Sequence, residues 1–227
     1  MLVSNKKNDE GTKMMLLEEI FKSKKAEHSD AFNLRIHRGL SWLKKSAELD
    51  QDLDLKFISL WVSFNALYAQ DVAIMQDKQS LKQFLSLICQ KDQEQKIDHI
   101  LWQKFNHLIV LLLENPYVYQ GFWDYQNQKI SQISWKAGFD QEKKQAHRAL
   151  QAKDSAHILW MVFNRLYTLH NQMILGGTTY NSAVNRKQLQ DACTLLAALL
   201  PIFIYVFLEN SQSLDFVQPF YPMVQVS

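Results

Sequence analysis

The segment FNRLYTLHNQMILGGTTY, residues 163–180, holds the side chains of this chain whose types and spacing best suit a chemical role. Arg165 and His170 are separated by four residues, and Asn171 follows directly. Histidine can take up or release a proton near neutral pH, and arginine carries a lasting positive charge suited to an anionic group. On a regular helix Arg165 and His170 would lie about 140° apart, so a second chain would have to complete a site built on both.

Other kinds of chemical site lack residues that they need. The acidic turn at residues 50–54 begins like a calcium loop, but Leu55 replaces the glycine of its tight turn and Trp61 replaces its glutamate. His99 and His107 share a helix face but stand about two turns, or ~12 Å, apart, which is too far for one metal ion. The sequence contains no glycine-rich phosphate loop, Gly-x-Ser-x-Gly elbow or His-Glu-x-x-His helix. We therefore expect neither a metal nor a cofactor.

Helices must position these side chains, because apolar residues recur at helical spacing along most of the chain. Only 6 Gly and 4 Pro occur in 227 residues, fewer than the turns of a sandwich or barrel would need. We expect one helix from Asp154 to Ile174, closed where Gly176-Gly177 allows a left-handed residue. The aromatic segment NPYVYQGFWDY contains a Pro and a Gly, and we expect it to be an ordered loop. The other expected helices cover residues 14–25, 29–49, 55–74, 80–89, 93–114, 135–151 and 186–209.

The composition favours one all-α domain. Hydrophobic residues make up 47% of the chain and aromatic residues 12%, enough for a sizeable core. We expect a polar N-terminal segment with a short helix at residues 1–28, a helical domain at 29–210 and a tail at 211–227. The net charge of +2 neither demands nor opposes a nucleic-acid partner.

The cysteines and the apolar stretches indicate a cytoplasmic protein. Cys89 and Cys193 lie in apolar helical stretches without Cys-x-x-Cys spacing, so we expect reduced core thiols. The polar N-terminal residues have no long apolar run of the kind that signal peptides carry. The apolar stretch Leu195–Leu208 contains Pro201 and is shorter than the roughly twenty residues of a bilayer span. We interpret it as a buried helix or an interface and expect no membrane partner.

Three segments, RIHRGLSWL at 35–43, LWVSFNALY at 60–68 and the segment 163–180, carry a resemblance to a known family. The chain resembles the HEPN proteins, specifically the Apea-like branch. In that branch an Arg-rich helix with a Trp-Leu pair precedes a helix that reads Trp-x-x-Phe-Asn-x-Leu-Tyr, and a later helix reads Leu-Tyr-x-x-Arg-Asn-Gln-x-x-His-Gly-Gly. The likeness extends from about Leu34 to Phe207. It implies an up-and-down helical bundle that dimerises and, in many members, a metal-independent endoribonuclease.

The resemblance also implies where an active motif would lie. The family's motif is an arginine, a polar residue, spacers and a histidine, brought together across the dimer. In this chain His170 stands at the arginine position, Asn171 matches the polar residue and Leu175 stands at the histidine position. Leucine can neither move a proton nor hold a phosphate oxygen. Gln172 and the Gly-Gly pair match the family, so we expect the turn to be kept while its chemistry is not.

These replacements favour a HEPN-fold protein that associates with RNA through a degenerate ribonuclease motif, either non-catalytic or weakened. The expected partners are a second copy of the chain, RNA, and an antitoxin or regulatory protein. Within this hypothesis Arg35, Arg38 and Gln172 are the candidate RNA-binding residues.

Two alternatives stay open. The first is an active metal-independent endoribonuclease of toxin or phage-defence type that uses Arg165, His170 and Asn171. The second is a helical dimerisation or protein-interaction module without a nucleic-acid role, with Leu195–Leu208 as its partner surface. An unreactive interpretation of the same residues makes Arg165 a surface guanidinium, and His170 and Asn171 the polar end of a helix.

Overall fold

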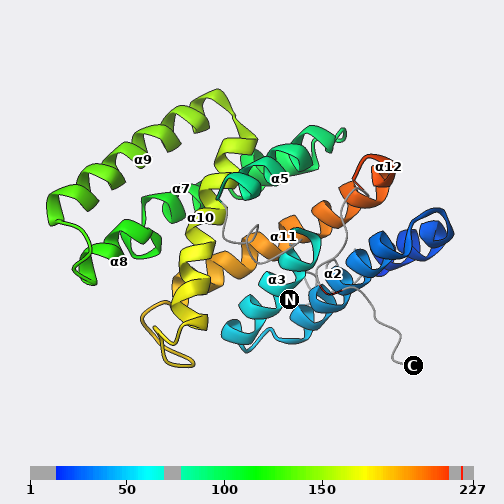
Figure 1. The fold of residues 1–227 in the computed structure, drawn as a ribbon, viewed down its shortest axis with the longest axis horizontal. Coiled ribbons are helices and arrows are strands. Elements are labelled where there is room, and N and C mark those ends of the chain that lie inside the picture. The colour runs from blue at the N-terminus through cyan, green and yellow to red at the C-terminus, as the bar shows by residue number, and fades with distance from the viewer. Residues whose placement is uncertain (1–13, 69–77, 215–220, 222–227) are drawn as a thin grey trace. The chain divides into compact units, whose positions relative to one another are not determined.

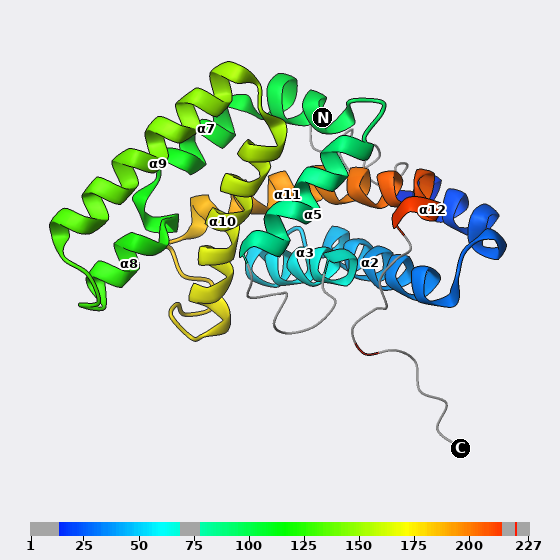
Figure 2. The ribbon, with the colours of Figure 1, turned by 45° about the horizontal axis from the view of Figure 1, so that its top comes forward.

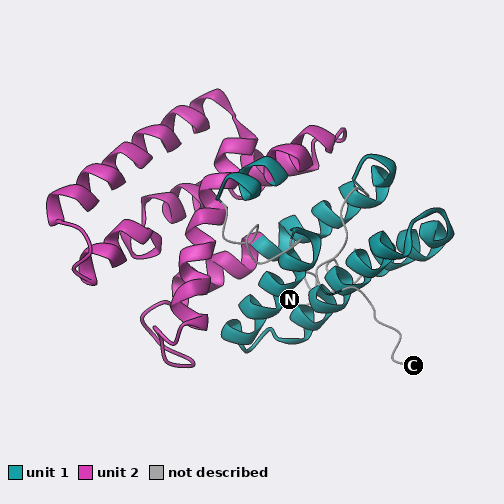
Figure 3. Cartoon of the chain, viewed as in Figure 1, with its two compact units in different colours: residues 1–84, 196–227 teal, residues 85–195 magenta. Residues whose placement is uncertain are grey.

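The computed structural model describes residues 14–68, 78–214 and 221, which form helices joined by turns (Figure 1). No strand occurs in those described ranges, and the all-α helical bundle expected from the sequence is confirmed. The chain divides into two compact units (Figure 3). Unit 1 comprises residues 1–84 and 196–227, and unit 2 comprises residues 85–195. The divisions fall inside α5 (Lys78–Lys91) and α11 (Arg186–Glu209).

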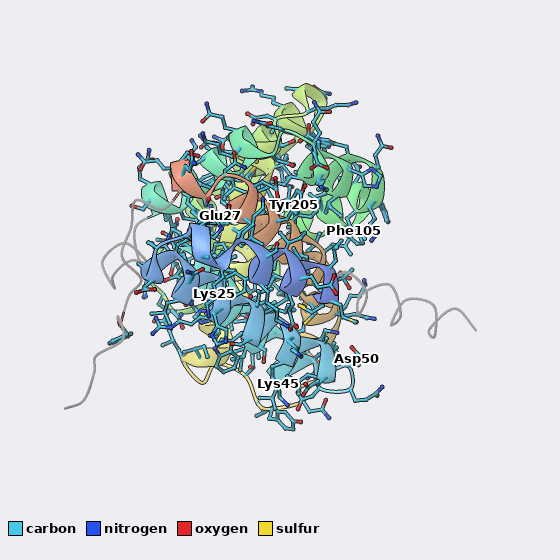
Figure 4. All side chains as sticks on the ribbon, turned by 90° about the vertical axis from the view of Figure 1, so that its right-hand side faces the viewer. Lys25, Glu27, Lys45, Asp50, Phe105 and Tyr205 are labelled. Carbon is cyan, nitrogen blue, oxygen red and sulfur yellow. The ribbon has the colours of Figure 1, made fainter. Side chains whose placement is uncertain are left out.

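Unit 1 is organised by the close pairing of α2 (Asp30–Glu48) with α3 (Leu53–Tyr68). Ser29 caps α2 by accepting the Phe32 N–H at 3.1 Å, as its place before the helix suggests. The helices approach closely at Gly39, whose carbonyl accepts the Ser63 hydroxyl at 2.7 Å. A Cβ on Gly39 would lie 3.1 Å from Leu67 Cδ2, so a small residue is needed at this crossing. Figure 4 labels Lys45 and Asp50, which flank the turn that ends α2.

The remaining helices of unit 1 largely follow the expected ranges. The N-terminal helix covers the described residues 14–24 and continues as a 3-10 turn at Lys25–Glu27. Residues 69–74 of the helix expected at 55–74 lie outside the described residues. The short helix α12 (Ser211–Leu214) lies within the expected tail.

Helix α11 has the bounds expected from the sequence and contains Pro201. At 24 residues it is long and apolar enough to cross a membrane by length and composition. About two-thirds of its most apolar window, 67%, is buried in the structure, and a core helix passes the same test.

Unit 2 departs from the expectations at its N-terminal half. The single helix expected at 93–114 is α6 (Lys96–Asp98), a π-helical turn η2 (His99–Lys104) and α7 (Asn106–Glu114). The Phe105 N–H donates to the Ile100 carbonyl, five residues back, at 3.0 Å, which is the π-helical bond that interrupts the α-helix. Such a one-turn change of hydrogen bonding leaves the apolar periodicity almost unaltered, so the sequence pattern does not reveal it.

The aromatic segment expected as a loop is helical. It forms the 3-10 turn η3 (Pro116–Val118) and then α8 (Gln120–Gln126). Asn115 caps η3 by accepting the Tyr117 N–H at 2.9 Å, and Pro116 occupies the first helical position, where it suits a helix. Gly121 lies within α8 and does not mark a loop. A side chain at this position would clash with Tyr119, because a Cβ there would lie 2.6 Å from Tyr119 Cε1. The glycine makes room for a ring.

The last two helices of unit 2 are α9 (Gln132–Ala152) and α10 (Ser155–Ile174), and α9 packs against α7, α8 and α10 (Figure 2). Ser131 caps α9, so this helix begins three residues before the expected start. The expected α10 is confirmed, with Asp154 as its N-cap. Gly176 closes it at a φ of 73°, and the Gly177 N–H reaches the Gln172 carbonyl at 2.7 Å. This Schellman turn is the glycine closure expected from the sequence.

Candidate functional site

His170 and Asn171 lie together on the last turns of α10. The His170 Nδ1 and Asn171 Oδ1 atoms are 3.2 Å apart, and the imidazole stacks on Tyr167 with 6.2 Å between ring centroids. Burial lowers the pKa of His170 below its ordinary value, and the hydrogen bond to Asn171 opposes that shift in part. A histidine with a lowered pKa is neutral at physiological pH, so it can accept a proton but supplies no positive charge.

Gln172 uses both ends of its side-chain amide inside the protein. Its Nε2 donates to the Tyr117 carbonyl at 3.0 Å, and its Oε1 accepts from Asn185 Nδ2 at 3.0 Å. The residue therefore joins η3, α10 and the start of α11. As a candidate RNA-binding residue it acts through the groups that it holds in place.

Arg165 is held in the interior of unit 2. Its side chain is 3% exposed, and its Nη2 lies 2.9 Å from Glu142 Oε2. The guanidinium also lies over the Tyr119 ring, 4.9 Å from its centroid, and over Phe139 at 5.7 Å. Burial lowers the pKa of Arg165, and the Glu142 carboxylate acts in the opposite direction. The interpretation of Arg165 as a surface guanidinium is wrong, because α9 supplies both a carboxylate and an aromatic wall that accommodate its charge.

Leu175, at the position that the resemblance assigns to a histidine, is 80% exposed. Three more large apolar side chains are exposed around this end of α10 and in the following turn: Ile174, Tyr180 and Val184. We call these four residues the α10-end patch. An aliphatic side chain in water contributes no acid, base or cation there.

The two arginines of unit 1 differ from each other. Arg35, a candidate RNA-binding residue, is only 4% exposed and belongs to the buried face of α2. The buried face of α2 includes polar residues beside its apolar ones, since Asn33 is buried as well. Arg38 is half-buried, and its Nη2 donates to the Tyr221 carbonyl at 2.6 Å. Arg38 is thus better placed than Arg35 to meet an anion at the surface of unit 1.

The structure pairs His170 with Asn171, directs Gln172 to Tyr117 and Asn185, and directs Arg165 to Glu142 on α9. No protein-family model, curated protein or solved structure matches this chain. Within the part of the chain that the structure describes, no group of three or more His, Cys, Asp or Glu side chains is arranged to hold a metal ion.

Sequence reasoning missed the neighbours of Gln172. Tyr117 and Asn185 are its hydrogen-bond partners, and they lie 55 and 13 residues away along the chain. Arg186 follows Asn185, and its Nε donates to the Ser182 carbonyl at 3.1 Å. One signal was visible in the sequence: from Ser155 to Gln190 there is no Asp or Glu. A run without carboxylates is an environment that an anionic partner can approach.

Proposed function

We propose that the chain is a HEPN-fold protein that acts as a cytoplasmic homodimer and binds RNA through a degenerate ribonuclease motif. The observation that carries this proposal is that Arg165 is buried within α10 while Leu175, the residue that ends this helix, is exposed. Metal-independent RNA cleavage through the 2′-hydroxyl needs a group that moves protons and a cation that holds the charge on phosphorus. His170 can do the first. Arg165 is the arginine of α10 and is already engaged by Glu142, so it does not do the second.

The active alternative requires Arg165 to hold a phosphate. Its guanidinium already has the Glu142 carboxylate at 2.9 Å and two aromatic rings beside it. Bringing RNA to this group would mean breaking a buried ion pair and opening the packing between α9 and α10, which costs several kcal/mol. The geometry therefore favours a binding protein over a ribonuclease built on Arg165.

The α10-end patch supports the homodimer and is also the specific observation in favour of an interaction module. Ile174 and Leu175 expose aliphatic surface at the end of the helix that carries His170 and Asn171, and Val184 is exposed before the start of α11. A second copy that covers this patch would place two His170–Asn171 pairs near one twofold axis, since a twofold interface uses the same surface from both copies.

The test is a binding and cleavage experiment on one preparation of purified protein with a labelled single-stranded RNA. We expect binding that weakens steeply as salt is raised, without cleavage in a single-turnover reaction. Cleavage that both His170→Ala and Arg165→Ala abolish would establish the active alternative. Failure to bind RNA, in a protein that forms a dimer, would establish the interaction module.

Sedimentation of wild type and Leu175→Asp tests the dimer separately. We expect a dimer for wild type and a monomer for the variant, because a charge in the patch would have to be desolvated. The matched control is Ile133→Asp, at an exposed aliphatic residue of unit 2 outside the α10-end patch, and this variant should remain dimeric. A monomeric wild type at micromolar concentration would overturn the shared-site part of the proposal.

A further inference from the structure

The ring of Tyr117 lies half in solvent on the turn that Gln172 holds. Its side chain is 52% exposed, which is unusual for an aromatic residue in a segment so rich in packed rings. It meets Phe122 edge to face, with 5.3 Å between centroids and 84° between planes. Phe122 continues the same packing to Trp135 at 5.4 Å. Phe122 therefore packs against the Tyr117 ring, while about half of Tyr117 stays exposed to solvent.

The backbone of Tyr117 is fixed by three hydrogen bonds. Its N–H donates to Asn115 Oδ1 at 2.9 Å, and its carbonyl accepts from Trp123 Nε1 at 2.7 Å and from Gln172 Nε2 at 3.0 Å. Two side-chain donors use both lone pairs of that carbonyl. A ring that is held before a ligand arrives loses little conformational entropy when the ligand binds.

The hydrogen bonds of Gln172 link the turn of Tyr117 to the residues that begin α11. Gln172 connects Tyr117 to Asn185, and Arg186 is the next residue along the chain, where its Nε donates to the Ser182 carbonyl. Lys187 follows and pairs with Asp191. On α8, the helix after the Tyr117 turn, the carboxylate of Asp124 accepts a hydrogen bond from Gln120 Nε2 at 3.0 Å.

We propose that Tyr117 is a stacking platform for an unpaired RNA base, and that Gln172 is a positioning residue that holds the turn of Tyr117 against the C-terminal end of α10. This inference rests on the proposed function and names how RNA is held at that site. An aromatic ring stacks on any base, whereas the phosphates on either side need cations, and Arg186, the residue after Asn185, is the candidate for one. Recognition should accordingly favour single strands and be tolerant of sequence.

The experiment measures fluorescence anisotropy of labelled single-stranded decaadenylate RNA with wild type, Tyr117→Phe and Tyr117→Leu at fixed salt. Tyr117→Phe should bind like wild type, because the ring stacks and the hydroxyl does not. Tyr117→Leu keeps apolar bulk without a stacking face and should bind about tenfold more weakly. The half-exposed ring can be replaced without emptying the core, and an unchanged far-UV spectrum confirms the fold. Ile133→Ala, at an exposed apolar residue of the same unit, is the matched control and should leave affinity unchanged.

Gln172→Ala tests the positioning role. It should weaken RNA binding in the wild-type background and have little further effect in the Tyr117→Leu background, because positioning the turn aids binding only while the aromatic ring is present. Additive losses would overturn that role.

The outcomes separate this inference from the function on which it rests. Binding by wild type that Tyr117→Leu leaves intact overturns the platform and leaves RNA binding standing. Absence of binding by wild type overturns both. A loss of affinity in Tyr117→Phe equal to that in Tyr117→Leu would assign recognition to the hydroxyl and overturn the stacking geometry.

Discussion

Arg165 Nη2 lies 2.9 Å from Glu142 Oε2, in an ion pair whose arginine is buried and whose glutamate is partly open to solvent. This relationship makes the arginine a structural group of the α9–α10 packing. Removing the carboxylate should leave a buried charge without its partner, so Glu142→Ala is expected to lower the free energy of unfolding by about 3 kcal/mol. Urea unfolding followed by circular dichroism measures it.

The control for that prediction is Asp140→Ala. Asp140 lies on the same helix and pairs with Lys143 at 2.8 Å in the open, where ion pairs contribute little. We expect no measurable change in the urea midpoint for this variant. Equal effects of the two substitutions would mean that burial of Arg165 does not matter to the Glu142 pair.

The pKa of His170 should lie below the ordinary value of about 6.5, and Asn171→Ala should lower it further, because the hydrogen bond to Asn171 favours the charged imidazole. A proton NMR titration of the imidazole measures both. A His170 pKa at or above the ordinary value would contradict the burial seen for this ring, and a pKa that rises in Asn171→Ala would contradict the hydrogen bond to Asn171.

The lowered pKa of His170 also predicts how the free energy of unfolding changes with pH. The folded state disfavours charged His170, so the unfolded state binds more protons as pH falls. The contribution of this residue is fully present above pH 6.5 and is lost as pH decreases from there through the lower folded-state pKa. In His170→Gln this part of the pH dependence should disappear, as urea midpoints at a series of pH values can show.

The turn that closes α10 should depend on Gly176. Its φ of 73° is left-handed, and a Cβ built there meets no atom within 4 Å, so the cost of Gly176→Ala is conformational. We expect a loss of about 1 kcal/mol, and a smaller loss for Gly176→Asn because asparagine tolerates this region. Thermal unfolding of the two variants tests this. If alanine were as stable as asparagine, the left-handed closure would be excluded.

Cys89 should be unreactive in the folded protein. Burial raises its pKa to about 12, with smaller contributions from Asp98, Asp92 and Asp154, so almost no thiolate exists at pH 8. Cys193 is buried. Iodoacetamide should therefore modify neither thiol in native protein and both in urea. Rapid native labelling at one site, identified by mass spectrometry, would show that the site opens.

The helical architecture could be predicted from sequence because its signals are local. The start of α10 at Asp154, its closure at Gly176 and the apolar spacing of α11 each act within a few residues, and each appears in the structure as expected. The aromatic segment that begins at Asn115 was mispredicted because its Pro and Gly serve a 3-10 turn and a ring contact, which have no periodic signal.

The site was less predictable because its contacts join distant parts of the chain. His170 and Asn171 are neighbours in sequence, and their pairing followed from that. The partner of Arg165 lies on another helix, and the carbonyl that Gln172 binds lies 55 residues away. No spacing rule connects such positions, so burial of Arg165 became visible only in the folded chain.

The central claim is that His170 and Leu175 stand where the chemistry of a ribonuclease has been lost. Single-turnover cleavage of one labelled single-stranded RNA by wild type and by the double variant His170→Arg/Leu175→His tests it most directly. The account predicts that wild type binds the RNA and leaves it intact, while the double variant, which restores a cation and a proton-transfer group at these positions, cleaves it without added metal. Cleavage by wild type that His170→Ala abolishes, or a double variant as inactive as wild type, would contradict it.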